Sequence, residues 1–146
     1  MIDIKPCTRK IDLLVVHCAD TYASMDIGRN EIDTWHRERG WIGIGYHYVI
    51  RRDGTIEKGR PDQTAGAHVE GHNYNSLGIC MVGGKGDNNA PADNFTPEQY
   101  EGLKELIIKL LAVYPEAKVV GHNDLNSHKA CPCFSVKNWL KKNVPK

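Results

Sequence analysis

No apolar run in this chain approaches the ~18 residues that a membrane-spanning helix needs, and the sequence contains no internal repeat or low-complexity segment. Neither sign of charge dominates, since the formal net charge is +1 at pH 7. Nucleic-acid-binding proteins usually carry a basic face or arm. We therefore expect no membrane partner and no direct nucleic-acid partner.

The chain also lacks the cysteine pattern of a disulfide-rich protein. Its five cysteines, Cys7, Cys18, Cys80, Cys131 and Cys133, are odd in number and irregularly spaced, which favours reduced thiols. The first residues show no basic segment followed by an apolar stretch and a cleavage site, so no conventional signal peptide is visible. We expect the protein to reside in the cytoplasm in which it is made.

What is present is the composition of an ordinary globular protein. Hydrophobic residues make up 40% of the 146 residues and charged residues 25%. This length is sufficient to bury a core without disulfides or structural metals. We expect a single domain over residues 1–146, and a monomer.

Apolar patterning predicts strands that alternate with helices. Strands are expected over residues 11–16, 77–82 and 118–121, a hairpin over 46–57 around Asp53-Gly54, and helices over 30–39, from residue 96 onward and over 136–142. Residues 83–89 are expected to form a mobile loop. This order predicts an α/β fold with a mixed central β-sheet flanked by helices.

Two of these elements have distinct local signals. At the start of the second predicted helix, Thr96, Pro97 and Gln99 form a predicted N-terminal capping box, and the apolar stripe that follows predicts core packing. In the hairpin, strict alternation would place Tyr46 and Tyr48 on one face and His47 on the other.

Histidine and cysteine at the ends of predicted strands suggest a metal site. His17 directly follows the first apolar strand, His122 follows the strand over residues 118–121, and Cys131 and Cys133 share a nearby loop. Two histidines and one cysteine are a common zinc ligand set, and three protein ligands leave a position open for catalysis. From spacing alone, either cysteine could be the ligand, and the alternative is a buried histidine beside ordinary free thiols.

Six short motifs occur in a fixed order along nearly the whole chain. They are Val15-Val16-His17, Gly45-Tyr46-His47-Tyr48, Ala65-Gly66-Ala67-His68, Asn75-Ser76-Leu77-Gly78-Ile79, Gly121-His122 and Lys129-Ala130-Cys131-Pro132. In this order and spacing the chain resembles the zinc-dependent N-acetylmuramoyl-L-alanine amidases, which include phage lysozymes of the T-odd type and peptidoglycan recognition proteins. Met25-Asp26-Ile27-Gly28 and Trp35-His36 add a likeness to the phage enzymes.

The resemblance implies an enzyme that hydrolyses the amide between N-acetylmuramic acid and L-alanine of peptidoglycan. It implies one catalytic Zn²⁺ held by His17, His122 and Cys131, because the family's cysteine ligand immediately precedes a proline. Tyr46 and Lys129 match catalytic positions of the phage amidases. His68 lies in a segment that borders the substrate cleft, so we expect it to contact substrate, and we expect His47 to be structural.

The resemblance to phage enzymes also implies a biological role. A phage or prophage endolysin of this kind would remain in the host cytoplasm and reach the periplasm and cell wall at lysis. Peptidoglycan is then the expected partner. Because the best-known phage relative inhibits its phage RNA polymerase, the resemblance also suggests such a polymerase as a regulatory partner.

Two further classes of function stay open at this point. A Cys-His hydrolase would attack through a thiolate and need no metal. A non-catalytic peptidoglycan-recognition module would bind the polymer without cutting it, although His17, His122 and Cys131 are all retained here.

Overall fold

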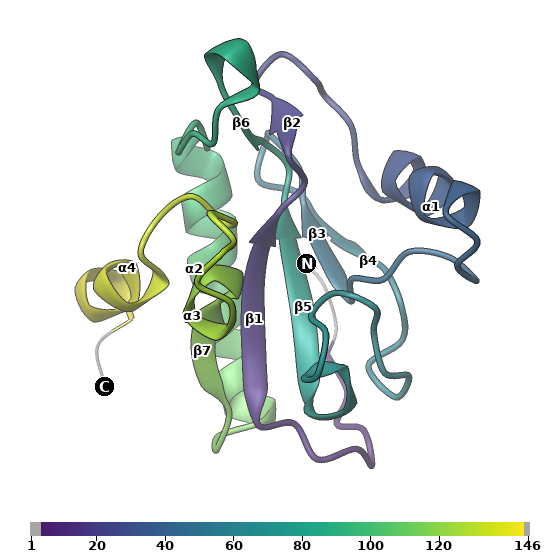
Figure 1. Ribbon diagram of the computed structural model, residues 1–146. Helices are drawn as coiled ribbons and strands as arrows, with labels where there is room; N and C mark the ends of the chain where they lie inside the picture. The colour runs from purple at the N-terminus through teal and green to yellow at the C-terminus, as the bar shows by residue number, and fades with distance from the viewer. Residues whose placement is uncertain (1–3, 145–146) are drawn as a thin grey trace.

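The computed structural model describes residues 4–144, which form a five-stranded mixed sheet and a small two-stranded sheet. The large sheet has the order β4-β3-β5-β1-β7, in which β4 runs antiparallel to β3 and the other neighbours are parallel (Figure 1). Its strands are β1 (Leu13–Cys18), β3 (Tyr48–Ile50), β4 (Ile56–Lys58), β5 (Ser76–Met81) and β7 (Lys118–Gly121). The mixed α/β architecture expected from the sequence is confirmed.

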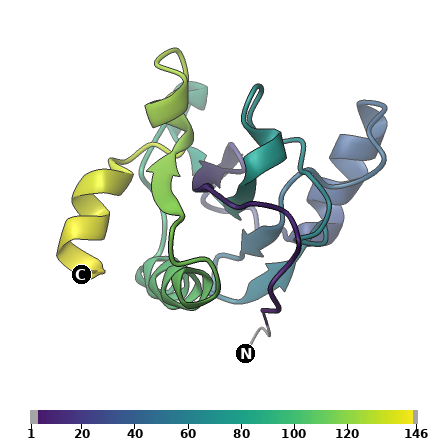
Figure 2. The same ribbon diagram turned by 90° about the horizontal axis from the view of Figure 1, so that it is seen from below.

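Helices cover both faces of this sheet. The elements are α1 (Arg29–Glu38), α2 (Pro97–Val113), α3 (His122–Leu125) and α4 (Val136–Asn143), with short 3-10 turns η1 (Asn73–Asn75) and η2 (Asp87–Asn89). Figure 2 shows α2 end-on along one side of the sheet, with α1 and α3 toward the other side. Within the described residues no helix is both long and apolar enough to cross a bilayer.

The main core lies between the sheet and α2. Its helical contribution is the predicted stripe, with Leu103, Leu106, Ile107 and Leu110 fully buried. These side chains pack against alternate residues of β1 and β5, since side chains on one face of a strand recur every second residue. A smaller core beneath α1 contains Ile32, Ile44, Val49, Cys80 and Val82.

Alternation along β1 decides where His17 lies. Leu14, Val16 and Cys18 belong to the core beneath α2, so His17 faces the other side of the sheet. The sequence suggested that the strand ends before His17, but β1 continues to Cys18 and His17 is only 1% exposed. His17 is therefore held by the sheet itself and not by a loop.

The predicted face of Tyr46 is wrong. Strand β3 begins only at Tyr48, so the two residues before it do not follow strand alternation. Tyr48 and Ile50 pack into the core beneath α2, whereas Tyr46 packs with Val49 against the smaller core. This break in alternation brings Tyr46 to the side of the sheet that carries His17.

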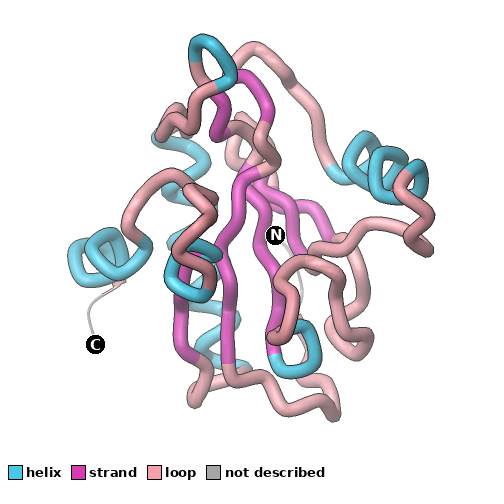
Figure 3. The backbone as a smooth tube through the Cα atoms, viewed as in Figure 1, coloured by secondary structure: helices cyan, strands magenta, loops and turns pink. Residues whose placement is uncertain are grey.

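The sequence missed several short elements. Residues 83–89, expected to be a mobile loop, contain β6 (Gly84–Lys85) and η2, and β6 pairs with β2 (Thr21–Tyr22). Helix α3 was also missed because it is a single turn. The segment between α3 and α4 is loop, as Figure 3 shows, and this loop carries Lys129, Cys131 and Cys133.

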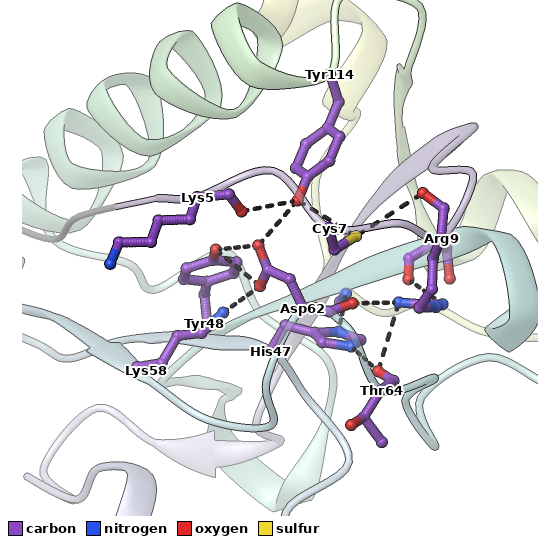
Figure 4. Close-up of polar contacts among 11 residues, drawn as sticks. Lys5, Cys7, Arg9, His47, Tyr48, Lys58, Asp62, Thr64 and Tyr114 are labelled. Atoms are coloured by element: carbon purple, nitrogen blue, oxygen red, sulfur yellow. Dashed lines mark hydrogen bonds and ion pairs between the residues drawn. The ribbon is translucent and has the colours of Figure 1, made fainter.

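A polar network lies beneath the N-terminal segment (Figure 4). The buried Asp62 carboxylate accepts hydrogen bonds from the hydroxyls of Tyr48, at 2.9 Å, and Tyr114, at 3.2 Å, and it pairs with Lys58. The Arg9 guanidinium donates to the carbonyl of Asp62 at 2.7 Å. The segment between β4 and β5 is thereby tied to the rest of the fold.

Candidate metal centre

Three elements bring two histidines and a cysteine together. His17 comes from β1, His122 is the first residue of α3, and Cys131 lies in the following loop. Strands β1 and β7 are parallel neighbours, and Val16 lies opposite Gly121. Each histidine directly follows one of these two paired residues, so both lie toward the carboxyl ends of their strands. The ring centroids of His17 and His122 are 4.7 Å apart.

Cys131 completes a compact donor group. Its Sγ lies 3.9 Å from Nδ1 of His17, and one ligand atom from each of the three residues lies within 4.8 Å of the others. The backbone N–H of Cys18 donates to this sulfur at 3.1 Å, and the carbonyl of Cys131 accepts from Asn123 at 2.8 Å. Two imidazoles and one thiolate at such separations fit zinc, whose ligands lie about 2.0–2.3 Å from the ion.

Cys133 points elsewhere. It has a positive φ of 74°, and its Sγ lies 4.0 Å from Sγ of Cys18 and within 3.4 Å of the carbonyl of Gly84. Burial, and to a smaller extent the nearby Cys18, raises the pKa of the Cys133 thiol to about 12. A protonated thiol directed at a carbonyl is a poor metal ligand, and Cys133 is absent from the donor group.

Electrostatics keep both histidines neutral. Burial, reinforced by His68 and His122, lowers the pKa of His17 well below its usual range. Burial also lowers the pKa of His122, and the positive charge of Lys129 adds to this effect. Neutral imidazole is the form that binds a metal, because protonation removes the lone pair.

Tyr46 stands beside the donor group. Its ring centroid lies 5.2 Å from that of His17 and 5.5 Å from that of His36 in α1. The Nδ1 of His36 accepts a hydrogen bond from the N–H of Gly45 at 2.9 Å, so α1 fixes the backbone before Tyr46. Burial raises the pKa of the Tyr46 hydroxyl well above its usual value, which leaves it a proton donor.

Two adjoining cavities open onto these residues. One of about 430 Å³ is lined by His17, Tyr46 and Cys131, and another of about 660 Å³ by Asn73, Leu125 and Asn126. Both are also lined by Trp41, Ala67, His68, His122 and Lys129. The two cavities therefore form two arms of one cleft: all three donor residues line the first arm, and His122 lines both.

The predicted residues outside the donor group divide into two sets. Lys129 and His68 line both arms of the cleft, together with Tyr46 in the first arm. His47 is fully buried and does not line the cleft: its Nε2 donates to the carbonyl of Thr64 at 2.8 Å, and its Nδ1 accepts from the N–H of Gly78 at 3.0 Å. The expectation that His47 is structural agrees with these bonds.

Sequence reasoning missed Trp41, which lines both arms of the cleft and is 37% exposed. Its ring lies 4.6 Å from that of His36, and the Arg39 guanidinium lies 5.6 Å from its centroid. The available signal was a large aromatic residue directly after Gly40, outside any predicted element. Loop aromatics of this kind often line binding sites.

Comparison with known proteins explains this constellation. Residues 8–134 match the family described as N-acetylmuramoyl-L-alanine amidase. The chain belongs to this family. The amidase is 45% identical over 132 residues to the endolysin of Escherichia phage T7, an alignment that covers 90% of this chain and 87% of that protein. It is 46% identical over 130 residues to the endolysin of Klebsiella phage KP32, covering 89% and 85%.

Solved structures agree with the fold of the amidase. The N-acetylmuramoyl-L-alanine amidase LysC from Clostridium intestinale superposes with a TM-score of 0.77 at 28% identity, covering 97% of this chain and 93% of that one. A bumblebee peptidoglycan recognition protein matches with a TM-score of 0.70 at 21% identity, covering 98% and 90%, and shows the fold alone. The chain is thus an enzyme of the class that cleaves the amide between N-acetylmuramic acid and L-alanine.

Proposed function

We propose that this amidase is a zinc-dependent phage or prophage endolysin whose active centre is formed by His17, His122 and Cys131. The observation that carries the proposal is the meeting of these three donor groups, within 4.8 Å of one another, in the first arm of the cleft, where His122 also borders the second arm. Three ligands match a catalytic site better than a structural site, which would use four.

The metal would address the difficulty of the reaction, in which a poor electrophile meets a weak nucleophile at neutral pH. Bound at this centre, zinc would lower the pKa of water toward ~7 and polarise the scissile carbonyl. His17 and His122 would hold it as neutral imidazoles, and Cys131 as a thiolate beside the N–H of Cys18.

Tyr46 and Lys129 are proposed to act on the charge that develops at the carbonyl oxygen. The positive charge of Lys129 lowers the pKa of His122, so the ammonium is close enough to interact electrostatically with the donor group. Tyr46 offers a protonated hydroxyl from beside His17. A cation and a fixed hydrogen-bond donor aimed at a developing oxyanion are typical of amide hydrolysis.

The two arms of the cleft suit a substrate that extends in both directions from the cleaved bond. We propose that the glycan side occupies one arm and the stem peptide the other. His68 and Trp41 line both arms and would contact the chain near the scissile amide. His68 is therefore retained as a substrate contact.

The proposed biological role is degradation of the host cell wall at lysis, supported by similarity to proteins named endolysins. This role requires passage from the host cytoplasm to the periplasm. Binding to a phage RNA polymerase and a monomeric state stay predictions, since no feature of residues 4–144 identifies a surface for a polymerase. A pull-down with the cognate polymerase would test the first, and sedimentation the second.

Digestion of purified peptidoglycan tests the proposed function. New free amino groups and new reducing sugars are assayed separately, before and after chelation and after zinc add-back. We expect zinc-restored release of amines without reducing ends, and mass spectrometry should place the cleavage before L-alanine. Reducing ends would indicate a glycosidase instead.

The same assay separates the remaining alternatives. Cleavage that survives complete removal of metal would favour the Cys-His hydrolase. Binding to peptidoglycan with intact metal and no product would favour a recognition module. Either result would overturn the proposal of a zinc-dependent endolysin.

A further inference from the structure

The two ring nitrogens of His17 face different partners. Its Nδ1 lies 3.9 Å from Sγ of Cys131, on the side of the donor group, and its Nε2 lies 2.8 Å from Nδ1 of His68. A neutral imidazole carries a proton on only one nitrogen. If Nδ1 binds a metal, the proton must be on Nε2, where it is donated to Nδ1 of His68.

The proton on the His68 ring is fixed by its two partners. Because Nδ1 of His68 accepts, its own proton lies on Nε2, which is 3.1 Å from the hydroxyl oxygen of Ser76. Ser76 is fully buried at the start of β5. Hydrogen bonds therefore run in one direction, from His17 to His68 to Ser76.

The His68 ring fits into a space that bare backbone provides. A Cβ at Gly78 would lie 2.6 Å from Cγ of His68, and a Cβ at Gly66 would lie 2.6 Å from Cδ2. The side-chain oxygen of Asn73 accepts from the N–H groups of His68 and Val69, each at 2.9 Å. Both the backbone and the ring of His68 are thus held in one orientation.

We propose that His68 is a positioning residue: it holds His17 in the tautomer whose Nδ1 is free to bind the metal, and Ser76 holds His68 in turn. The inference rests on the proposed zinc centre. Both nitrogens of His68 are engaged, so the substrate meets only carbon atoms of its ring. Outer partners of metal-binding histidines typically contribute about 10- to 100-fold to metal affinity.

The test compares three substitutions of His68. His68→Asn keeps an acceptor near the position of Nδ1, facing His17. His68→Gln moves the polar group toward Ser76 and leaves Nε2 of His17 without a partner, and His68→Leu removes both contacts. His72→Asn, in the same segment, is the matched control. Asn and Gln are both polar and differ in whether an acceptor faces Nε2 of His17. Comparing these two variants therefore tests the positioning role even if the Leu variant does not fold.

Zinc dissociation constants are measured by competition with a chromogenic chelator. We expect His68→Gln and His68→Leu to weaken zinc binding by about 10- to 100-fold, and His68→Asn and His72→Asn to bind nearly as the parent protein does. A second readout is the ¹⁵N shifts of the His17 ring in the metal-free protein. They should show a proton on Nε2 in the parent and in His68→Asn, and mixed tautomers in His68→Gln.

Folded Gln and Leu variants with parental zinc affinity and an unchanged His17 tautomer would overturn the proposal. So would a parent protein that binds no zinc, a result that would also overturn the proposed centre. A parent that binds zinc but releases no amine would contradict only the proposed function, because affinity and tautomer are measured without substrate.

Discussion

At the scale of single residues, Cys131 and Cys133 differ in the direction in which their side chains point. Sγ of Cys131 faces His17, while the positive φ of Cys133 turns its sulfur toward Cys18 and Gly84. The order Cys-Pro-Cys alone could not show this, since it does not fix the backbone of the loop. The assignment of Cys131 as the ligand now rests on geometry as well as on resemblance.

The two sulfurs lead to opposite outcomes for metal binding. We expect Cys131→Ala to lose bound zinc, because one of three ligands disappears, and Cys133→Ala to keep it. Metal content after desalting, measured by atomic emission, checks both variants. Zinc retained by Cys131→Ala and lost from Cys133→Ala would reverse the assignment.

Tyr46 and Lys129 should affect turnover without affecting metal content. We expect Tyr46→Phe and Lys129→Ala each to lower kcat about 10²-fold or more, by analogy with removal of an oxyanion donor. Amine release from peptidoglycan by variants of known zinc content is the measurement. Tyr74→Phe and Lys137→Ala, at exposed positions, are the controls. Near-normal turnover in the zinc-loaded variants would count against these two roles.

At the scale of elements, the start of α2 joins the helix to the sheet. The hydroxyl of Thr96 accepts from the N–H of Gln99 at 3.0 Å and donates to the carbonyl of Arg52 at 2.7 Å. The buried Gln99 amide donates to the carbonyls of Val82 and Ile50, at 2.8 and 3.2 Å. The predicted capping box is confirmed, and it also satisfies carbonyls where β3 and β5 end.

Loss of this cap should lower stability while activity stays intact. We expect Thr96→Ala to lower the free energy of unfolding by about 1–2 kcal/mol, because an N–H of the first turn loses its acceptor. Amidase activity should be unchanged, since α2 covers the face of the sheet opposite the cleft. Urea unfolding measures the effect.

Thr34→Ala is the matched control for this cap. Among residues 4–144, the exposed hydroxyl of Thr34 bonds only within α1, to the carbonyl of Asn30. We expect its change in stability to be smaller than that of Thr96→Ala. Equal losses of stability in the two variants would mean that the cap stabilises the protein no more than an ordinary exposed threonine does.

At the scale of the whole molecule, buried neutral histidines make the fold sensitive to acid. Burial lowers the pKa of His47 from 6.5 to about 4. Protonation would also oppose its contacts, because Nδ1 accepts from Gly78 and could no longer do so. The unfolded chain therefore takes up this proton near pH 6.5, whereas the folded chain takes it up only near pH 4.

Because of this difference in proton uptake, acid should lower the stability of the folded protein. Stability contributed by neutral His47 is present above about pH 6.5, is lost as the pH falls toward 4, and changes no further below that. For this residue we expect a loss of about 2 kcal/mol between pH 7 and pH 5. Urea unfolding of the metal-free protein at both values gives the total loss.

Substitution isolates the share of His47. His47→Asn cannot titrate, so its loss between pH 7 and pH 5 should be smaller than that of the parent by about 2 kcal/mol. His128→Asn, at an exposed position, should behave as the parent does. An identical acid dependence in His47→Asn and the parent would contradict this account.

Local sequence patterns predicted the main elements of the fold and the residues of the site. Apolar periodicity located β1, β5, α1 and α2, because burial requires one face of each element to be apolar. Spacing left two cysteines open, and the motifs selected His17, His122, Cys131 and Lys129, because their chemistry depends on residue type and order. These signals are local, so they can be read without the fold.

Only the tertiary structure showed which way the side chains of the site point and which residues they contact. The late start of β3 placed Tyr46 on the His17 side, the backbone at Cys133 removed that sulfur from the donor group, and two glycines admitted the ring of His68 beside His17. Each depends on contacts between segments far apart in the chain. Local propensity does not encode such contacts, because they form only when the sheet brings those segments together.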